Sequence, residues 1–183
     1  LEGLTVTINA SRSALPTGAH TPISLLAREI LQYASTIDEA LAIAQRRDVF
    51  VSESILVGSA KDGRAAVIEK APDGMGVFDP GNGLVVCANH YQSDTFRDTE
   101  VNKANIRDSD SMSRFKRMTD LTSTGVPMTP IDAVRVLRER TGPYAPASII
   151  VNAVRGRTTG GRLSDDSSLR YIISNTSICT TSP

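Results

Sequence analysis

Tryptophan is absent from the 183-residue sequence, and cysteine and histidine occur only twice each. Cys87 and Cys179 are too few to staple a disulfide scaffold, and neither they nor His20 and His90 have the paired spacing of a zinc site. No apolar run approaches the roughly 20 residues that a membrane-spanning helix needs. The sequence therefore predicts neither a metal centre nor a membrane partner.

An excess of charge is also absent, because 20 Lys and Arg residues balance 20 Asp and Glu residues. The sequence has no cluster of basic residues that could attract the phosphate backbone of a nucleic acid, so no nucleic-acid partner is predicted. The composition, 40% hydrophobic and 22% charged, is that of a globular chain with one core. We predict a single domain over residues 1–183, and nothing in the sequence indicates a cellular compartment.

The two ends of the sequence suggest a piece of a longer protein. The chain begins with Leu1 rather than Met and enters a strand-like run at residues 4–9 almost at once. Near the other end, residues 171–173 have the pattern of a buried strand shortly before the sequence stops. We therefore expect residues 1–183 to be a fragment whose partner segment is missing.

Two amphipathic helices are predicted in the first quarter of the sequence. A helix over 23–34 carries an apolar stripe that includes Leu26 and Tyr33. Thr36 and Glu39 then have the spacing of a capping box, in which each side chain satisfies an amide at the start of a helix. The second helix is expected to end at about residue 47.

Strand signals lie on both sides of these helices. Between two β-rich runs, Asp62-Gly63 provides the positive φ that a tight hairpin turn needs. Two further helices are predicted, one from 109 to about 121 and one that begins at Pro130. Residues 155–168 are expected to form a loop. The predicted strands are 4–9, 54–60, 64–70, 75–78, 84–88, 148–153 and 171–173. This order indicates an α+β fold in which helices cover a sheet on its outer side.

General catalytic motifs are mostly missing. There is no Gly-x-Ser-x-Gly elbow, no phosphate-binding glycine loop and no His-Glu-x-x-His motif. The Ser-x-x-Lys pattern at 113–116 lacks its Lys-Thr-Gly companion and is expected to be accidental. His20 lies in a polar loop and is expected to be exposed.

Polar residues follow a buried strand at Asn89 and His90, and Asn9 ends the first strand. The end of a strand is a place where a sheet fixes a catalytic group while a loop gives access to it. A neutral Asn amide can donate a hydrogen bond to a developing oxyanion. The alternative is that these side chains only cap local backbone, and the spacing alone does not separate the two interpretations.

Three segments together resemble a known family. Residues 3–9 (GLTVTIN), 88–91 (ANHY) and 110–115 (DSMSRF) occur in the order typical of N-terminal-nucleophile amide hydrolases of the penicillin acyltransferase and choloylglycine hydrolase group. The resemblance covers roughly residues 3–120 and is closest to the isopenicillin N acyltransferase branch. It implies a four-layer αββα sandwich, incomplete in this chain, and a cysteine nucleophile whose own α-amine is the base after autoproteolysis.

The resemblance also implies roles for individual residues. Asn89 matches the oxyanion asparagine of an Asn-His-Phe motif, with Tyr91 in place of the phenylalanine. Arg114 matches the arginine beside the nucleophile, where a guanidinium would favour a thiolate, and Asn9 matches an asparagine near the substrate. The family nucleophile would precede Leu1. We therefore expect it in a missing N-terminal segment.

The resemblance leaves the substrate open. Members of the group act on penicillins, conjugated bile salts, acyl-homoserine lactones or N-acyl amines, so the expected partner is a small-molecule amide. No cofactor is implied, although the acyltransferase branch can use acyl-coenzyme A as donor. Cys87 is expected to be a small buried hydrophobe, and residues 1–183 alone are expected to be inactive. The competing hypothesis is a non-catalytic α+β binding or structural domain.

Overall fold

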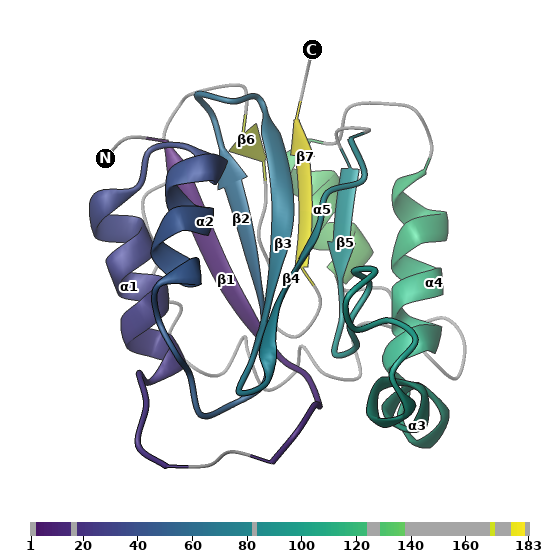
Figure 1. The fold of residues 1–183 in the computed structure, drawn as a ribbon. Coiled ribbons are helices and arrows are strands. Elements are labelled where there is room, and N and C mark those ends of the chain that lie inside the picture. Colours follow the sequence, from purple (N-terminus) through teal and green to yellow (C-terminus); the bar gives the residue numbers. More distant parts are fainter. Residues whose placement is uncertain are drawn as a thin grey trace.

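The computed structural model describes residues 3–15, 18–81, 84–123, 129–137, 169–170 and 177–181. Within these ranges the strands form two sheets (Figure 1). The first sheet is antiparallel, and its strands follow the order of the sequence: β1 (Leu4–Ala10), β2 (Glu53–Ser59), β3 (Arg64–Ala71) and β4 (Gly74–Phe78). The second has the order β5-β7-β6, with β5 (Leu84–Cys87), β7 (Ser177–Thr181) and β6 (Leu169–Arg170).

The hairpin of β2 and β3 is the centre of the first sheet. Its turn uses Gly63 at φ +61°, a left-handed conformation that glycine adopts without strain. The predicted Asp-Gly turn is therefore confirmed. Both strands are almost entirely buried because the sheet is covered on both faces.

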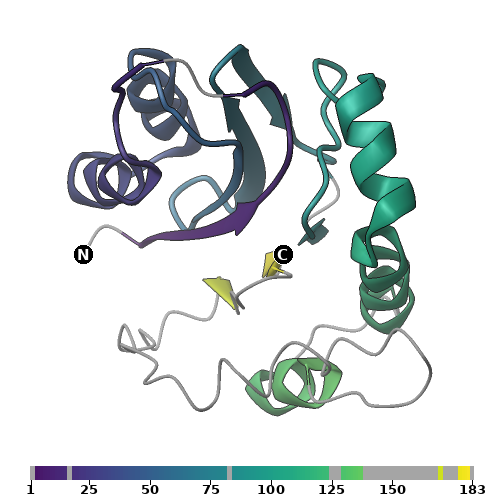
Figure 2. The same ribbon diagram turned by 90° about the horizontal axis from the view of Figure 1, so that it is seen from below.

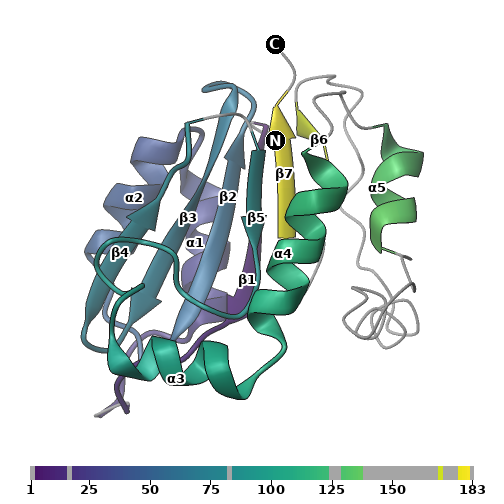
Figure 3. The same cartoon turned by 90° about the vertical axis from the view of Figure 1, so that its right-hand side faces the viewer.

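Helices α1 (Ile23–Tyr33) and α2 (Ile37–Gln45) cover the outer face of the first sheet (Figure 3). The Thr36 hydroxyl accepts a hydrogen bond from the Glu39 amide at 3.2 Å, as the capping box predicts. The Asp62 carboxylate, from the hairpin turn, accepts a second one from the Ile37 amide at 2.6 Å. The start of α2 is therefore fixed both by its own cap and by the sheet below it.

The apolar stripe of α1 is narrower than the sequence predicts. Ile23, Leu26 and Ile30 are buried, but Tyr33 is 67% exposed. The buried face instead continues through Ala34, which is 4% exposed and follows the last helical residue. A small side chain fits there against the sheet, so the prediction for Tyr33 was wrong.

The inner face of the first sheet packs against the second sheet (Figure 2). Leu56 and Val67 contact Val85 and Cys87 in one buried cluster. The strand predicted at 84–88 is confirmed as β5, but it pairs with β7 rather than extending the first sheet. On the far side of β5 lies α4 (Ser111–Thr122), where Met118 packs against Val86.

Two more helices complete the described structure. α5 (Pro130–Leu137) begins at the predicted proline, and α3 (Glu100–Asp108) was not predicted. The strands predicted at 148–153 and 171–173 and the loop at 155–168 lie outside the described residues. No helix in the described ranges is long and apolar enough to span a membrane.

The fold class is confirmed at the coarser level. Antiparallel sheet and helices are combined in the α+β manner, compatible with an N-terminal-nucleophile type of fold. The complete four-layer sandwich and the single domain over 1–183 stay predictions.

Candidate active site

The end of β1, the segment after β5 and the first turns of α4 meet at one place. Ala10 is the last residue of β1, Asn89 lies two residues after β5, and Arg114 lies in the first turn of α4. These positions are up to 104 residues apart along the chain (114 − 10), and hydrogen bonds join them directly. The three segments carry the motifs singled out in the sequence.

Asn89 is hydrogen-bonded through all four of its polar groups. Its backbone N–H donates to the Ser111 hydroxyl at 2.8 Å, and its backbone carbonyl accepts from the side-chain nitrogen of Asn105 at 2.6 Å. Its side-chain oxygen accepts from Arg114 at 2.8 Å, and its side-chain nitrogen donates to the Ala10 carbonyl at 2.8 Å. The residue is half-buried, so it is rigidly held and still borders solvent.

Arg114 carries a buried positive charge beside this amide. The residue is 4% exposed, and its guanidinium forms an ion pair with the Asp110 carboxylate at 3.0 Å, one helical turn earlier. Burial of a charge is costly unless the charge is paired and hydrogen-bonded. Asp110 supplies the paired charge, and the Asn89 oxygen supplies a hydrogen-bond acceptor.

Asn9 lies next to this group but is buried between the two sheets. Its side chain is 1% exposed, and its nitrogen donates to the Cys87 carbonyl at 3.4 Å. In the sheet register Asn9 is opposite Ser54, whose hydroxyl hydrogen-bonds with that of Ser11 at 2.9 Å. Asn9 thus connects the end of β1 to the end of β5, one residue from the carbonyl that holds Asn89.

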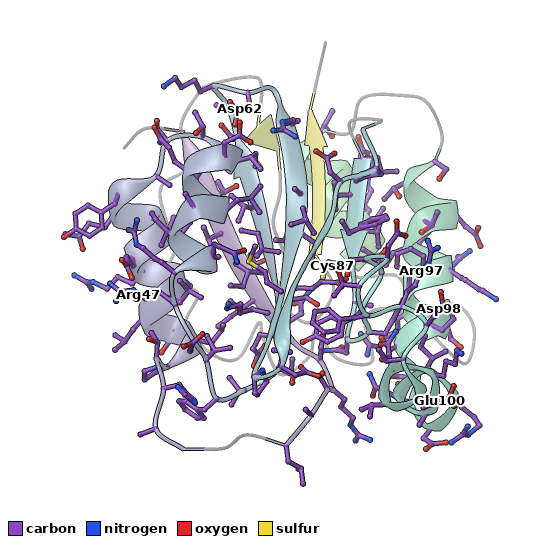
Figure 4. The ribbon with its side chains drawn as sticks, in the orientation of Figure 1. Arg47, Asp62, Cys87, Arg97, Asp98 and Glu100 are labelled. Atoms are coloured by element: carbon purple, nitrogen blue, oxygen red, sulfur yellow. The ribbon has the colours of Figure 1, made fainter. Side chains whose placement is uncertain are left out.

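Cys87 is a buried hydrophobic residue, as the sequence predicts. It is fully buried in the cluster between the sheets, and Figure 4 places it inside the molecule, whereas Arg47 lies at the periphery. Burial raises the pKa of its thiol to about 12. A thiol in this environment is neutral and inaccessible, which are the opposite properties of a catalytic nucleophile.

The two histidines differ in environment. His20 is exposed, as predicted. His90 is 2% exposed, and its Nδ1 lies 2.8 Å from the Ser111 hydroxyl. Phe115 packs edge-on against its ring, with 5.3 Å between the ring centres. Burial, together with the nearby charge of Arg114, lowers the pKa of His90 to about 4, so the ring is neutral at pH 7.

The loop after His90 is fixed by a buried carboxylate. Glu69, on β3, is fully buried and accepts from the Ser93 hydroxyl at 2.5 Å and from the backbone amides of Gln92 and Ser93. Burial raises the pKa of Glu69, although these hydrogen bonds oppose the shift. This carboxylate anchors the loop to the sheet.

Tyr91 is also fixed by hydrogen bonds, through both its backbone and its side chain. The carboxamide of Asn102 accepts from the backbone amide of Tyr91 at 2.9 Å and donates to its carbonyl at 3.0 Å. The Tyr91 hydroxyl donates to the Lys70 carbonyl, and its ring stacks on Phe96. Tyrosine in place of the expected phenylalanine therefore gains a buried hydrogen bond.

The structure brings together two of the three predicted site residues by direct contact, Asn89 and Arg114, and places Asn9 beside them in the interior. Asn102 and Asn105 were not identified from the sequence, because both lie in α3, a helix that was not predicted. Their polar side chains at i and i+3 give no apolar stripe, although Thr99 provides a capping signal. Within the described ranges, no cluster of three or more His, Cys, Asp or Glu side chains could hold a metal ion.

Comparison with known proteins agrees with the resemblance read from the three motifs. The family model for acyl-coenzyme A:6-aminopenicillanic acid acyl-transferase matches residues 1–153, which extends beyond the segments that suggested it. Curated proteins and solved structures give no match. Because the matched residues are most of the chain, this chain belongs to the acyl-coenzyme A:6-aminopenicillanic acid acyl-transferase family, a family of N-terminal-nucleophile hydrolases.

Proposed function

We propose that this chain forms the transition-state-stabilising side of an amide hydrolase or acyltransferase that works through an acyl-thioester. The observation that carries the proposal is the fixed amide of Asn89, with its oxygen on Arg114 and its nitrogen on Ala10. A donor that is held before substrate binds needs no reorganisation when charge develops. Asn89 has this property and also borders solvent.

Asn89 would act as the oxyanion donor. A carboxamide nitrogen carries two hydrogens, and the Ala10 carbonyl uses one of them. The other can donate to the oxygen of a tetrahedral intermediate. Because Arg114 draws electron density toward the amide oxygen, it makes the amide a stronger hydrogen-bond donor.

The nucleophile would be a cysteine thiol outside residues 1–183. Cys87 is unsuited to this role because it is fully buried and its pKa is about 12. In the proposed reaction the thiol attacks the amide carbonyl, the C–N bond breaks, and the amine leaves with a proton. Water or another amine then attacks the thioester and regenerates the thiol.

Arg114 and Asn9 would support this chemistry at close range. The guanidinium charge of Arg114 favours the thiolate form of a nearby cysteine. Asn9 would fix the ends of β1 and β5 against each other, and so hold Ala10, whose carbonyl orients the amide of Asn89 at the oxyanion. Neither role requires a metal or an organic cofactor.

The family name supports acyl transfer between an acyl-coenzyme A and the amine of a penicillin nucleus. For this chain we propose the wider class of linear or cyclic small-molecule amides, with acyl-coenzyme A as a candidate donor. The amide can be cleaved by water or remade with an amine, because both outcomes pass through the same thioester.

The test uses the complete protein and four probes: phenoxymethylpenicillin, glycocholate, N-hexanoyl-homoserine lactone and an N-acyl-phenylalanine. We expect release of the amine from at least one probe, and iodoacetamide should abolish it by labelling a cysteine outside residues 1–183. Residues 1–183 alone should be inactive. If the complete protein cleaves none of the probes, the proposal is wrong and a non-catalytic domain becomes the better interpretation. If alkylation of Cys87 or Cys179 causes the inhibition, the proposed position of the nucleophile is wrong.

A further inference from the structure

Ser111 and His90 form a close contact that the proposed reaction does not use. The Ser111 hydroxyl lies 2.8 Å from His90 Nδ1 and also accepts the backbone N–H of Asn89 at 2.8 Å. Ser111 is the first residue of α4, and His90 directly follows Asn89. One oxygen atom therefore connects α4, the histidine ring and the backbone of the proposed oxyanion residue.

A serine beside a histidine is also the arrangement of a nucleophile and its base. Burial argues against that role here, since Ser111 is 0% exposed and His90 is 2% exposed. A nucleophile must reach a carbonyl carbon, and the Ser111 oxygen is already surrounded by two protein partners. The pair is therefore placed to hold structure, not to attack a substrate.

The hydrogen bonds of this pair have a definite direction. The backbone N–H of Asn89 can only donate, so the Ser111 oxygen accepts that bond. The single hydroxyl hydrogen of Ser111 is then best used on an unprotonated Nδ1 of His90, which leaves the proton of the neutral ring on Nε2. The low pKa of His90, about 4, keeps the ring neutral at pH 7, so one of its two nitrogens is unprotonated.

The ring itself is held by the same helix. Phe115, one turn after Ser111 on α4, packs edge-on against His90 at an interplanar angle of 79°. Hydroxyl and phenyl groups from one helix thus define both the position and the rotation of the imidazole. Any displacement of this ring would be passed to the Ser111 hydroxyl and from there to the Asn89 backbone.

We propose that Ser111 and His90 are positioning residues that hold the backbone of Asn89 through a directed hydrogen-bond chain, Asn89 N–H to Ser111 O–H to His90 Nδ1. This inference rests on the proposed function, because it assigns the pair to the oxyanion donor. It adds two residues whose effect on the reaction passes entirely through Asn89.

The kinetic test compares variants of the complete protein. Ser111→Ala should lower kcat about 10- to 100-fold with little change in KM, since small misplacement of a reacting group has effects of this size. In an Asn89→Ala background the same change should have almost no further effect. Thr122→Val is the matched control, because it removes another buried hydroxyl of α4, which donates to the Met118 carbonyl. An equal loss from Ser111→Ala in both backgrounds, or an equal loss from the control, would overturn the inference.

Histidine substitutions test whether the ring acts through its hydrogen bond to Ser111. His90→Asn places an acceptor oxygen close to the position of Nδ1 and should keep most of the activity, whereas His90→Leu should resemble Ser111→Ala. Similar losses from both histidine variants would contradict a hydrogen-bonding role for the ring.

A spectroscopic test does not depend on activity. Nitrogen-15 spectra of the imidazole at pH 7 should show His90 protonated on Nε2 only, and amide exchange at Asn89 should become faster in Ser111→Ala. A protonated Nδ1, or unchanged exchange, would overturn the inference even in an active protein. If no probe substrate is cleaved but both spectroscopic results hold, the proposed function fails and the hydrogen-bond chain stands.

Discussion

The guanidinium of Arg114 lies 2.8 Å from the side-chain oxygen of Asn89. Because a guanidinium only donates hydrogen bonds, this contact determines which end of the carboxamide is oxygen. The nitrogen must then face the Ala10 carbonyl, as observed. The orientation of the proposed oxyanion donor is thus set by α4 and β1 before any substrate binds.

Replacing Asn89 should remove most of the catalytic rate. We expect Asn89→Ala to lower kcat by about 10²- to 10³-fold, the cost of losing one oxyanion donor, or about 3 kcal/mol. Single-turnover kinetics with the best probe substrate would measure it, with a thermal melt to check folding. A folded variant with unchanged turnover would reject the role.

Removing the charge of Arg114 should shift the pH dependence of the reaction. The cation favours the thiolate, so Arg114→Gln should raise the pKa of the nucleophile and move the acid limb of kcat/KM to higher pH. The rate of alkylation by iodoacetamide, measured against pH, reports the same pKa without substrate. An acid limb that stays in place would contradict an electrostatic effect of Arg114 on the nucleophile.

Cys87 should resist alkylation in the folded protein. With a pKa of about 12, only about one thiol in 10⁴ is ionised at pH 8, and the side chain is fully buried. Peptide mapping after iodoacetamide treatment should find Cys87 unmodified until urea unfolds the chain. Modification at the rate of an exposed thiol would show that the space between the sheets opens.

His90 should make stability fall as the pH drops. Its folded-state pKa of about 4 lies below the unfolded value of 6.5, so the unfolded state binds more protons between these limits. The contribution is complete above pH 6.5 and is lost as the pH falls toward 4. Between pH 7 and pH 5 the loss should be about 2 kcal/mol in the free energy of unfolding.

Urea titrations at the two pH values, compared with those of His90→Asn, would isolate this contribution. The comparison is needed because Glu69 acts in the opposite direction, since its raised pKa means that the folded state binds the extra proton. Identical pH dependence in the two proteins would contradict a buried neutral histidine.

Gly76 should be far more sensitive to substitution than Gly74, although both lie in β4. A Cβ atom at Gly76 would overlap the Ser93 hydroxyl and approach the Cβ of Thr95 to 3.1 Å, whereas one at Gly74 would meet only Phe96 at 3.6 Å. Gly76→Ala would push Ser93 away from the Glu69 carboxylate, and we expect it to cost about 2 kcal/mol of stability. Gly74→Ala should be nearly neutral, and equal melting temperatures for the two variants would contradict this account.

Local patterns in the sequence were enough to predict most elements of the first half. The Asp62-Gly63 turn, the alternation along β1 and the capping box of α2 each depend on interactions between near neighbours, which short windows contain. α3 was not predicted because its buried residues, Asn102 and Asn105, are polar. Both side chains hydrogen-bond to backbone groups, so the helix sequence has no periodic pattern of apolar residues. Tyr33 was wrongly predicted to lie on the apolar stripe, because the helix ends at that residue and the side chain of Ala34 packs in the core instead.

The candidate site was only partly predictable for a different reason. The motifs indicated Asn9, Asn89 and Arg114 through a family resemblance, and the match to the family model supports that resemblance. The contact between Asn89 and Arg114, and those of Ser111 and Asn105, join segments that only the complete fold brings together. No rule of spacing could show that Asn9 is enclosed between the sheets while Asn89 reaches solvent.

The Asp62 carboxylate gives the β2–β3 turn a significance for protein engineering. Exposed turns of this length are usual places for epitope tags, labels or new chain termini. Here the turn also holds the first amide of α2 at 2.6 Å, so an insertion would release a helix that lies on the central hairpin. Tags for purification or fluorescence are better placed elsewhere on this protein.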